Sequence, residues 1–532
     1  MLLTLIALAS AEEYRVGPDE GRVLLPSLLQ IVQPGDVIVI AENYEPQTAG
    51  IWIEIDDLTI RGEGEGSEIE PIRVTGATNL VLSKLTIRSS SSSFSSGGAS
   101  YAYVNRDHAL VLQGGSVVME ESSFEGFSSY GPIWVEDADL TLKDVSFLDI
   151  EPAASGTNFL FNVHVGGADL YTVALQDVSV LSTSQMGAIQ ATSQGGRNDI
   201  VVTGGRFEGL YAPRGALVNW DVSAGAGTLT LSGVTADGNG SQDGEIYAKG
   251  GELRLDDYTS QGSTGGSLLY LESGSMEIYG SALLGGDRAE GGGSMRLVGS
   301  VVEIKRSMIC GPTGQYEGDI WAEGGQLTLQ NTTVQASSGP ATLLSQDGTL
   351  KLENVSLIDN EQVAVKVEGA QDLSVVNALF QGSDLGLIVD DESHVDRVVY
   401  SLFWGNAQDV SGEDLLAGEG IVLDEEPTWA LGLDPLACDP PMPLGDSPVI
   451  DRGDPALTDP WGGRSDIGTY GGPGSEDIGL EPSAGDTADI DDSGDTGALG
   501  PRTWRSGGSC QAGAGAGLLG LLGLLVLRRR GR

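Results

Sequence analysis

Basic side chains, aromatic rings, histidine and cysteine are all scarce in this sequence. Its 532 residues carry 28 Lys and Arg against 76 Asp and Glu, which gives a formal net charge of −48. This balance argues against a nucleic-acid partner, because nucleic-acid binders need a basic surface that displaces counterions from phosphates. With only three His and three Cys, a metal centre built from His and Cys ligands is hard to assemble. We therefore expect no cofactor of that kind.

Glycine and apolar residues are abundant instead. The chain has 79 Gly, and 40% of its residues are hydrophobic. A disordered acidic chain lacks that much apolar surface, so the sequence predicts a long folded core. The glycines predict many tight turns between short elements.

The first eleven residues, Met1–Ala11, form a short apolar segment. They read MLLTLIALASA, and their last three residues fit the small-x-small pattern of a signal-peptide cleavage site. Two glutamates follow at once. We therefore expect residues 1–11 to be a signal peptide and the protein to be exported.

The other end of the chain, residues 510–532, combines a cysteine, an uncharged segment and an arginine cluster. Cys510 precedes the uncharged run Ala512–Leu527, and Arg528 opens the cluster that follows. This order resembles the C-terminal sorting signals of myxobacteria and related Gram-negative bacteria. The resemblance implies that Cys510 is the processing and anchoring point. The alternative is a plain membrane anchor with its arginines on the cytoplasmic side.

An acidic, low-complexity segment separates this anchor from the body of the protein. Ser475–Leu499 contains eight acidic residues and neither Lys nor Arg. Such a composition cannot bury enough apolar surface to offset its chain entropy. We expect residues 475–509 to form a flexible acidic tether.

The body repeats one alternating pattern of apolar and polar residues. Examples are NLVLSKLTI from Asn79, DLTLKDVSF from Asp139 and TLKLENVSL from Thr349. Corresponding apolar residues recur at intervals of about 23 residues, and a second short alternating strand precedes most of them. A unit of that length with strands and no helix is one coil of a β-solenoid. The sequence therefore predicts an all-β domain of about fourteen coils over residues 12–474.

Three stretches of the body carry motifs of a known repeat architecture. They are GDVIVIAENYEP from Gly35, LTIRGEGEGSEI from Leu58, and the segment 447–474. The first two resemble the opening coils of the right-handed parallel β-helix in the pectin-lyase-like superfamily, and the third resembles the closing segment of bacterial β-helix repeat proteins. The resemblance implies a right-handed parallel β-helix with a structural end-cap at 447–474, in which Arg464 ties carboxylates together. It implies little about function, because this fold carries many activities.

One column of outward residues in the short strands is rich in aromatic rings. It lies six residues before each recurring apolar residue, and its neighbours on both sides are small or aliphatic, so alternation turns it away from the core. Successive coils are about 4.8 Å apart, which predicts a ladder of flat faces on which sugar rings stack. The alternative is that these rings are covered or pair between strands. The predicted ligand-binding residues are Trp134, Tyr247, Tyr270, Arg296 and Trp321.

A second group of candidates lies near the two longest intervals between coils. The extra residues there should project from one edge of the solenoid as long loops, which often carry function. The candidate catalytic residues beside them are Arg106, Asp107, His108 and His164. The alternative, which we favour, is that they are solvated loop residues.

The string IWVED at Ile133–Asp137 approaches a pectate-lyase motif. It lacks that motif's histidine, and its first part recurs as IWAE at Ile320–Glu323, at the same place of another coil. A recurrence at the repeat period indicates a structural role for the string.

Acidic runs and two cysteines complete the candidates. Ca²⁺ prefers oxygen ligands, but no EF-hand loop is present, and the alternative is a solvated acidic surface. Cys310 and Cys438 are the only cysteines of the body and could pair in an oxidising compartment. The candidate Ca²⁺ ligands are Asp390, Asp391 and Glu392, together with Asp56 and Asp57.

These features together predict an exported β-helix protein that is anchored at the outer cell surface or envelope through its C-terminus. Its expected role is binding or adhesion to a glycan or another envelope component, without catalysis. The alternative is a polysaccharide lyase or glycoside hydrolase acting on an acidic polysaccharide, which needs a compact set of titratable groups. A third interpretation is a passive spacer.

Overall fold

The computed structural model describes residues 11–475, apart from 18–23, 47–49, 65, 89–107, 130, 149, 153–157, 182–185, 286, 289–292, 312, 315–317, 413–414, 430–441 and 461. All of these residues belong to the first of two units of the chain, Met1–Asp489. The other unit, Ile490–Arg532, lies outside the described residues.

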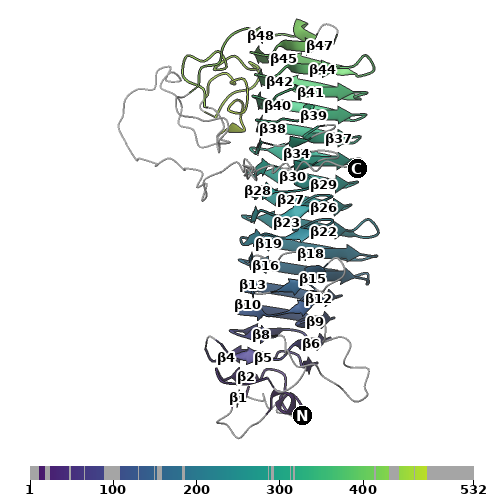
Figure 1. Ribbon diagram of the computed structural model, residues 1–532, viewed down its shortest axis with the longest axis vertical. Coiled ribbons are helices and arrows are strands. Elements are labelled where there is room, and N and C mark those ends of the chain that lie inside the picture. Colours follow the sequence, from purple (N-terminus) through teal and green to yellow (C-terminus); the bar gives the residue numbers. More distant parts are fainter. Residues whose placement is uncertain are drawn as a thin grey trace, which may run out of the picture. The chain divides into compact units, whose positions relative to one another are not determined.

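Two large parallel sheets run side by side along this unit, and each strand pairs with a strand of the next coil (Figure 1). The 15-stranded sheet contributes one strand per coil, so the solenoid has about fifteen turns, one more than the sequence predicted. The all-β parallel solenoid is thereby confirmed.

The 15-stranded sheet consists of β3 (Ile51–Ile53), β6 (Ile72–Thr75), β9 (Leu110–Gln113), β12 (Ile133–Glu136), β15 (Asn158–Val165), β18 (Met186–Ser193), β22 (Val218–Asp221), β26 (Ile246–Lys249), β29 (Leu269–Glu272), β33 (Met295–Val298), β37 (Ile320–Glu323), β39 (Ala341–Gln346), β41 (Val363–Glu368), β44 (Leu385–Val389) and β47 (Gln408–Ser411).

The 27-stranded sheet consists of β1 (Glu13–Val16), β2 (Val37–Ile40), β4 (Thr59–Gly62), β5 (Glu68–Ile69), β7 (Leu80–Ser83), β8 (Thr86–Arg88), β10 (Ser116–Glu125), β13 (Asp139–Leu148), β16 (Leu170–Gln176), β17 (Ser179–Leu181), β19 (Arg197–Thr203), β20 (Arg206–Glu208), β23 (Ala226–Ser232), β24 (Thr235–Asp237), β27 (Glu252–Asp256), β28 (Thr259–Ser263), β30 (Ser275–Tyr279), β31 (Ala282–Gly285), β34 (Val301–Lys305), β35 (Met308–Cys310), β38 (Gln326–Gln335), β40 (Thr349–Ile358), β42 (Asp372–Val376), β43 (Leu379–Gln381), β45 (Val395–Val399), β46 (Leu402–Trp404) and β48 (Val422–Leu423).

Six two-residue strands form three small pairs: β11 (Ser128–Ser129) with β14 (Glu151–Pro152), β21 (Tyr211–Ala212) with β25 (Gly240–Ser241), and β32 (Asp287–Arg288) with β36 (Thr313–Gly314). The described helices are α1 (Leu25–Leu28) and the 3-10 helix η2 (Leu415–Ala417). Leu25 and Leu28 of α1 are buried against the core.

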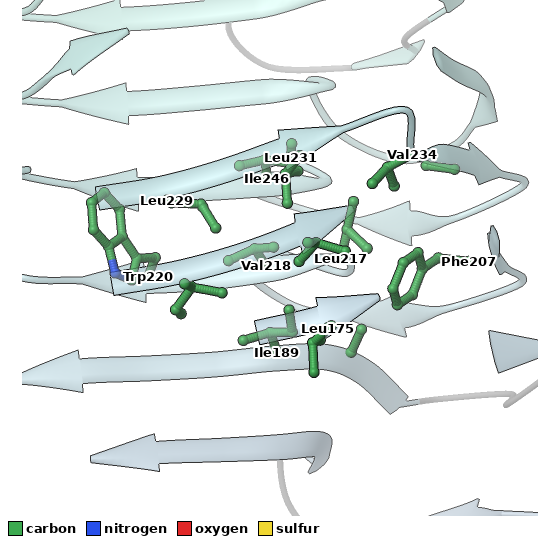
Figure 2. Close-up of a cluster of buried hydrophobic side chains, with 14 of the residues drawn as sticks. Leu175, Ile189, Phe207, Leu217, Val218, Trp220, Leu229, Leu231, Val234 and Ile246 are labelled. Carbon is green, nitrogen blue, oxygen red and sulfur yellow. The ribbon is translucent and has the colours of Figure 1, made fainter. Parts of the chain in front are cut away.

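The core lies between the two sheets, where equivalent side chains of successive coils stack. Leu229, Leu253 and Met276 are in register on β23, β27 and β30, and all three are buried. Figure 2 shows side chains of both sheets filling the space between them, with the fully buried Trp220 at the left edge of the cluster. Burial of such a continuous apolar stack supplies the stability that a single coil lacks.

The C-terminal segment 447–475 packs against the side of the solenoid, next to β38, β40 and β43 (Figure 1). Val449 and Ile467 pack with Ile358, Leu379 and Leu402 of three successive coils. The expectation of an end-cap is therefore wrong in position, because the segment binds several coils laterally.

Buried asparagines of neighbouring turns hold this segment. Asn331 Nδ2 donates to the carbonyl oxygens of Thr469 (2.9 Å) and Gly471 (2.7 Å). Asn377 Nδ2 donates to Ser465 Oγ (3.0 Å), and its Oδ1 accepts from a backbone N–H of the segment. These bonds give the segment one fixed register on the coils.

Among the described residues, no carboxylate pairs with Arg464, contrary to the expectation. Its Nε donates to the Gly453 carbonyl oxygen at 2.6 Å, and its guanidinium lies over the Tyr400 ring, 5.6 Å from the centroid. Arg464 therefore braces the backbone of the segment.

Several sequence predictions fall outside the described residues: Met1–Ser10 of the signal peptide, Cys438, the tether from residue 476 onward, and the anchor with Cys510. Among residues 11–475, no described helix has the length and apolar character needed to cross a membrane. The targeting and anchoring segments stay predictions.

Candidate ligand-binding face

One outward column of the 15-stranded sheet contains all five predicted ligand-binding residues. Strand pairing places them in register, with four of them on consecutive coils. The column reads Trp52, Arg73, Val111, Trp134, Asn162, Gln190, Asn219, Tyr247, Tyr270, Arg296, Trp321, Leu344, Lys366, Ile388 and Ser411. We call the part from Trp134 to Trp321 the binding strip.

The binding strip differs in chemistry from the outer face of the 27-stranded sheet. The 27-stranded sheet carries exposed ion pairs, such as Arg88 with Glu125 (2.6 Å) and Arg254 with Asp256 (2.6 Å). Pairs of this kind give a hydrated surface and little stability. The binding strip carries rings and amides instead, which suit contact with a partly apolar ligand.

At one end of the strip, two histidines flank Trp134. The ring centroid of Trp134 lies 5.5 Å from that of His108 and 4.4 Å from that of His164. His108 Nδ1 lies 2.5 Å from the Gly131 carbonyl oxygen, and His164 Nδ1 lies 2.9 Å from Thr192 Oγ1. Two of the four candidate catalytic residues therefore meet here, while Arg106 and Asp107 lie outside the described residues.

Glu136 is a titratable neighbour of this cluster that sequence reasoning had set aside as structural. It is in register with His164 and accepts a hydrogen bond from Gln113 Nε2 at 2.8 Å. Burial lowers the pKa of His164, and the Glu136 charge opposes that shift in part. His164 is consequently neutral at neutral pH.

At the other end, a cation–ring stack extends through five residues. The Arg214 guanidinium lies 4.6 Å from the centroid of Tyr247, which stacks on Tyr270 at 5.0 Å and an interplanar angle of 23°. Arg296 follows, 5.5 Å from the centroid of Tyr270 and 4.3 Å from that of Trp321. Trp321 Nε1 donates a hydrogen bond to Gln346 Oε1 of the next coil at 2.8 Å.

This stack corrects the expectation of flat faces open to sugar rings. Tyr270 has Tyr247 on one side and Arg296 on the other, so its neighbours cover both faces. Tyr247 is only 6% exposed, and burial raises the pKa of its hydroxyl. A ligand lying on the strip meets ring edges, hydroxyls and guanidinium groups.

Three amides lie between the two clusters, on consecutive strands β15, β18 and β22. The Asn162 amide is buried and donates to the Phe159 carbonyl oxygen at 3.2 Å. Gln190 and Asn219 are half-buried, and neither side chain hydrogen-bonds to any residue that the structure describes. Each leaves one acceptor and two N–H donors for a ligand.

Three of the candidate Ca²⁺ ligands, Asp390, Asp56 and Asp57, hold turns through hydrogen bonds. Asp390 accepts hydrogen bonds from Gly369 N (3.0 Å) and Ser393 Oγ (2.5 Å), which lower its pKa. Asp56 accepts two hydrogen bonds from Thr78, and Asp57 accepts one from Asn79. Within the described part of the chain, His, Cys, Asp and Glu form no group of three that could hold a metal ion, so the grouping of Asp390, Asp391 and Glu392 as a metal site is not supported.

Cys310 is buried and disulfide-bonded. Cys438 lies outside the described residues, so its pairing with Cys310 stays a prediction.

Comparison with known proteins gives no family for this chain. No family model and no curated protein matches the chain. Solved structures that it resembles include a PL6 alginate lyase in complex with a trisaccharide (10% identity, 88% of this chain and 96% of that chain, TM-score 0.29). They also include the Yersinia enterocolitica family 28 exopolygalacturonase (10%, 79% and 80%, TM-score 0.22). An alginate lyase in complex with G6 is a third (11%, 79% and 85%, TM-score 0.20). Likenesses at this level carry no information on what this chain binds.

Proposed function

We propose that this protein is an exported, surface-anchored solenoid that binds a polysaccharide along the binding strip without chemical change. The observation that carries the proposal is the pair of amides, Gln190 and Asn219, left open between two aromatic clusters. Amides hydrogen-bond sugar hydroxyls as donors and as acceptors, and ring edges supply apolar contact beside them.

The dimensions of the strip favour a polymer over a small molecule. From Trp134 to Trp321 the strip crosses eight consecutive strands, which at 4.8 Å per coil is roughly 34 Å. A chain of sugars contacts many such positions at once, so modest contacts add up to useful affinity.

Export and anchoring complete the proposal. The disulfide at Cys310 supports an oxidising compartment, where such bonds persist. The apolar segment at 1–11 directs export, and the segment that begins at Cys510 attaches the protein to the envelope. The acidic segment 475–509 is a flexible spacer between the attachment point and the solenoid.

The test is retention of the whole protein on immobilised neutral and acidic polysaccharides. We expect Gln190→Ala with Asn219→Ala to weaken binding, and Thr230→Ala, on the 27-stranded sheet, to leave it unchanged. Each lost hydrogen bond should weaken binding roughly threefold to tenfold. Equal binding by both variants, or no binding by the wild type, would overturn the proposal.

A polysaccharide lyase or hydrolase is the second candidate, and the His108–Trp134–His164 cluster favours it. A neutral His164 beside Glu136 can accept a proton, as a general base must. New reducing ends or ultraviolet absorbance from unsaturated products, abolished by His164→Ala, would establish this activity and exclude binding alone.

A further inference from the structure

Most arginines of the described region bind carboxylates, as expected for a protein with 76 acidic residues. Those in ion pairs are Arg15, Arg61, Arg88, Arg197, Arg206, Arg214, Arg254, Arg397 and Arg452. Three others hydrogen-bond neutral oxygens, namely Arg73, Arg306 and Arg464.

Arg296 differs from all of these. It forms neither an ion pair nor a hydrogen bond with any residue of the described part of the chain, and its Nε is buried without a partner. Its contacts are the two rings, Tyr270 and Trp321. Stacking on both faces of a guanidinium leaves its N–H edge as the only place for a polar partner.

The sequence around Arg296 keeps carboxylates off its own strand. The next outward residue of β33 is Val298, where the two neighbouring coils have Glu272 and Glu323 in register. Glu272 is paired with Lys249 at 2.9 Å. Glu323 is exposed, and no ion pair joins it to a described residue, so it is the carboxylate whose charge opposes a second anion here.

We propose that Arg296 is an anion-binding position of the binding strip, which takes the carboxylate or sulfate of an acidic polysaccharide. The two rings hold the guanidinium in a fixed plane, so its fork meets an acid group bidentately with little loss of side-chain entropy. This inference rests on the proposed function and narrows its ligand to a polyanion. A bound anion would supply the polar partner that Arg296 lacks among the described residues.

The experiment measures dissociation constants of the full chain for polygalacturonate and for its methyl ester, which lacks the charge. We expect Arg296→Gln to weaken polygalacturonate binding by about tenfold or more and to leave binding of the ester unchanged. Arg254→Gln, which removes the same charge from the 27-stranded sheet, is the matched control and should change neither constant. Glu323→Gln should strengthen polygalacturonate binding roughly twofold.

Four outcomes would overturn the inference, and they separate it from the proposed function. Equal weakening by Arg296→Gln and Arg254→Gln would mean that only net charge acts. Equal weakening of both polymers by Arg296→Gln would mean that Arg296 only supports the rings. Binding of neutral polymers alone, still dependent on Gln190 and Asn219, would refute the anion site and leave the proposed function standing. Absence of binding to any polysaccharide would refute both.

Discussion

Glu245 carries a proton in the folded protein at a pH where exposed glutamates are ionised. It precedes β26, is fully buried, and accepts hydrogen bonds from Tyr258 Oη and from Ser260 Oγ (3.2 Å). Burial raises its pKa from 4.5 to about 7, although these hydrogen bonds favour the charged form and oppose the shift. Glu245→Gln imitates the protonated group at every pH.

The pKa difference sets the size and sign of the effect. Below pH 4.5 both states of the chain hold the proton, so Glu245 costs nothing. As pH rises to 7, the unfolded chain releases the proton first, and folding stability falls until the folded pKa is passed. The full loss is about 3 kcal/mol, because one pKa unit corresponds to 1.36 kcal/mol. We therefore expect Glu245→Gln to stabilise the protein by about 3 kcal/mol at pH 8 and by less than about 1 kcal/mol at pH 5.

Hydrogen exchange over β26 and β29 measures this locally, when variant and wild type are compared at the same pH. Glu252→Gln, an exposed carboxylate on β27, controls for the change in net charge and should have no pH-dependent effect. A Glu245→Gln variant that is destabilised equally at pH 5 and pH 8 would refute the reasoning. The hydrogen bonds of the carboxylate would then outweigh its desolvation.

Two further predictions concern a turn and the C-terminal segment. Gly251 has φ +66°, and a Cβ there would lie 2.3 Å from Trp220, so Gly251→Ala should cost about 2–4 kcal/mol in thermal unfolding. Gly238 has φ +61° and open space around it, so Gly238→Ala should lower the free energy of unfolding by only about 1–2 kcal/mol. Equal losses of stability in the two variants would contradict the steric argument. Asn377→Ala should leave buried partners unpaired at a cost of about 1–3 kcal/mol and speed proteolysis within 447–475, while the solenoid stays resistant. Unchanged cleavage would show that the apolar contacts alone hold the segment.

The fold was predictable because every coil repeats the same apolar alternation. Leu229, Leu253 and Met276, recognised from spacing, are in register and buried. The count of coils was one short, since the register shift between β42 and β45 breaks the pattern after Leu373. The docking place of 447–475 could not be predicted, because it depends on side chains such as Asn331 that lie more than a hundred residues away.

The sequence predicted outward residues of the column correctly in those coils where few residues connect the strand of the 15-stranded sheet to the next strand of the 27-stranded sheet. Tyr247 lies six residues before Leu253, and the rule of six placed it in the outward column. Asn219 lies ten residues before Leu229, so the same rule missed it, together with Asn162 and Gln190. The alternation of apolar and polar residues predicted that the rings point outward. It did not predict the side-chain torsions that stack the rings along the solenoid axis.

The unpaired amides of Gln190 and Asn219 contrast with other polar side chains of this solenoid, which hydrogen-bond to one another. Parallel stacking brings equivalent residues within reach of each other, and polar pairs then bond along the column, as Asn377 does with Asn354 (2.8 Å) and Gln346 with Glu368 (2.7 Å). Gln190 and Asn219 are in register on adjacent strands, and yet they bond neither each other nor any other described residue. A half-buried amide without a partner loses part of its hydration for no return. A ligand that supplies the hydrogen bonds would recover that cost. The unpaired amides, rather than the rings, are therefore the positions at which we expect this surface to bind its ligand.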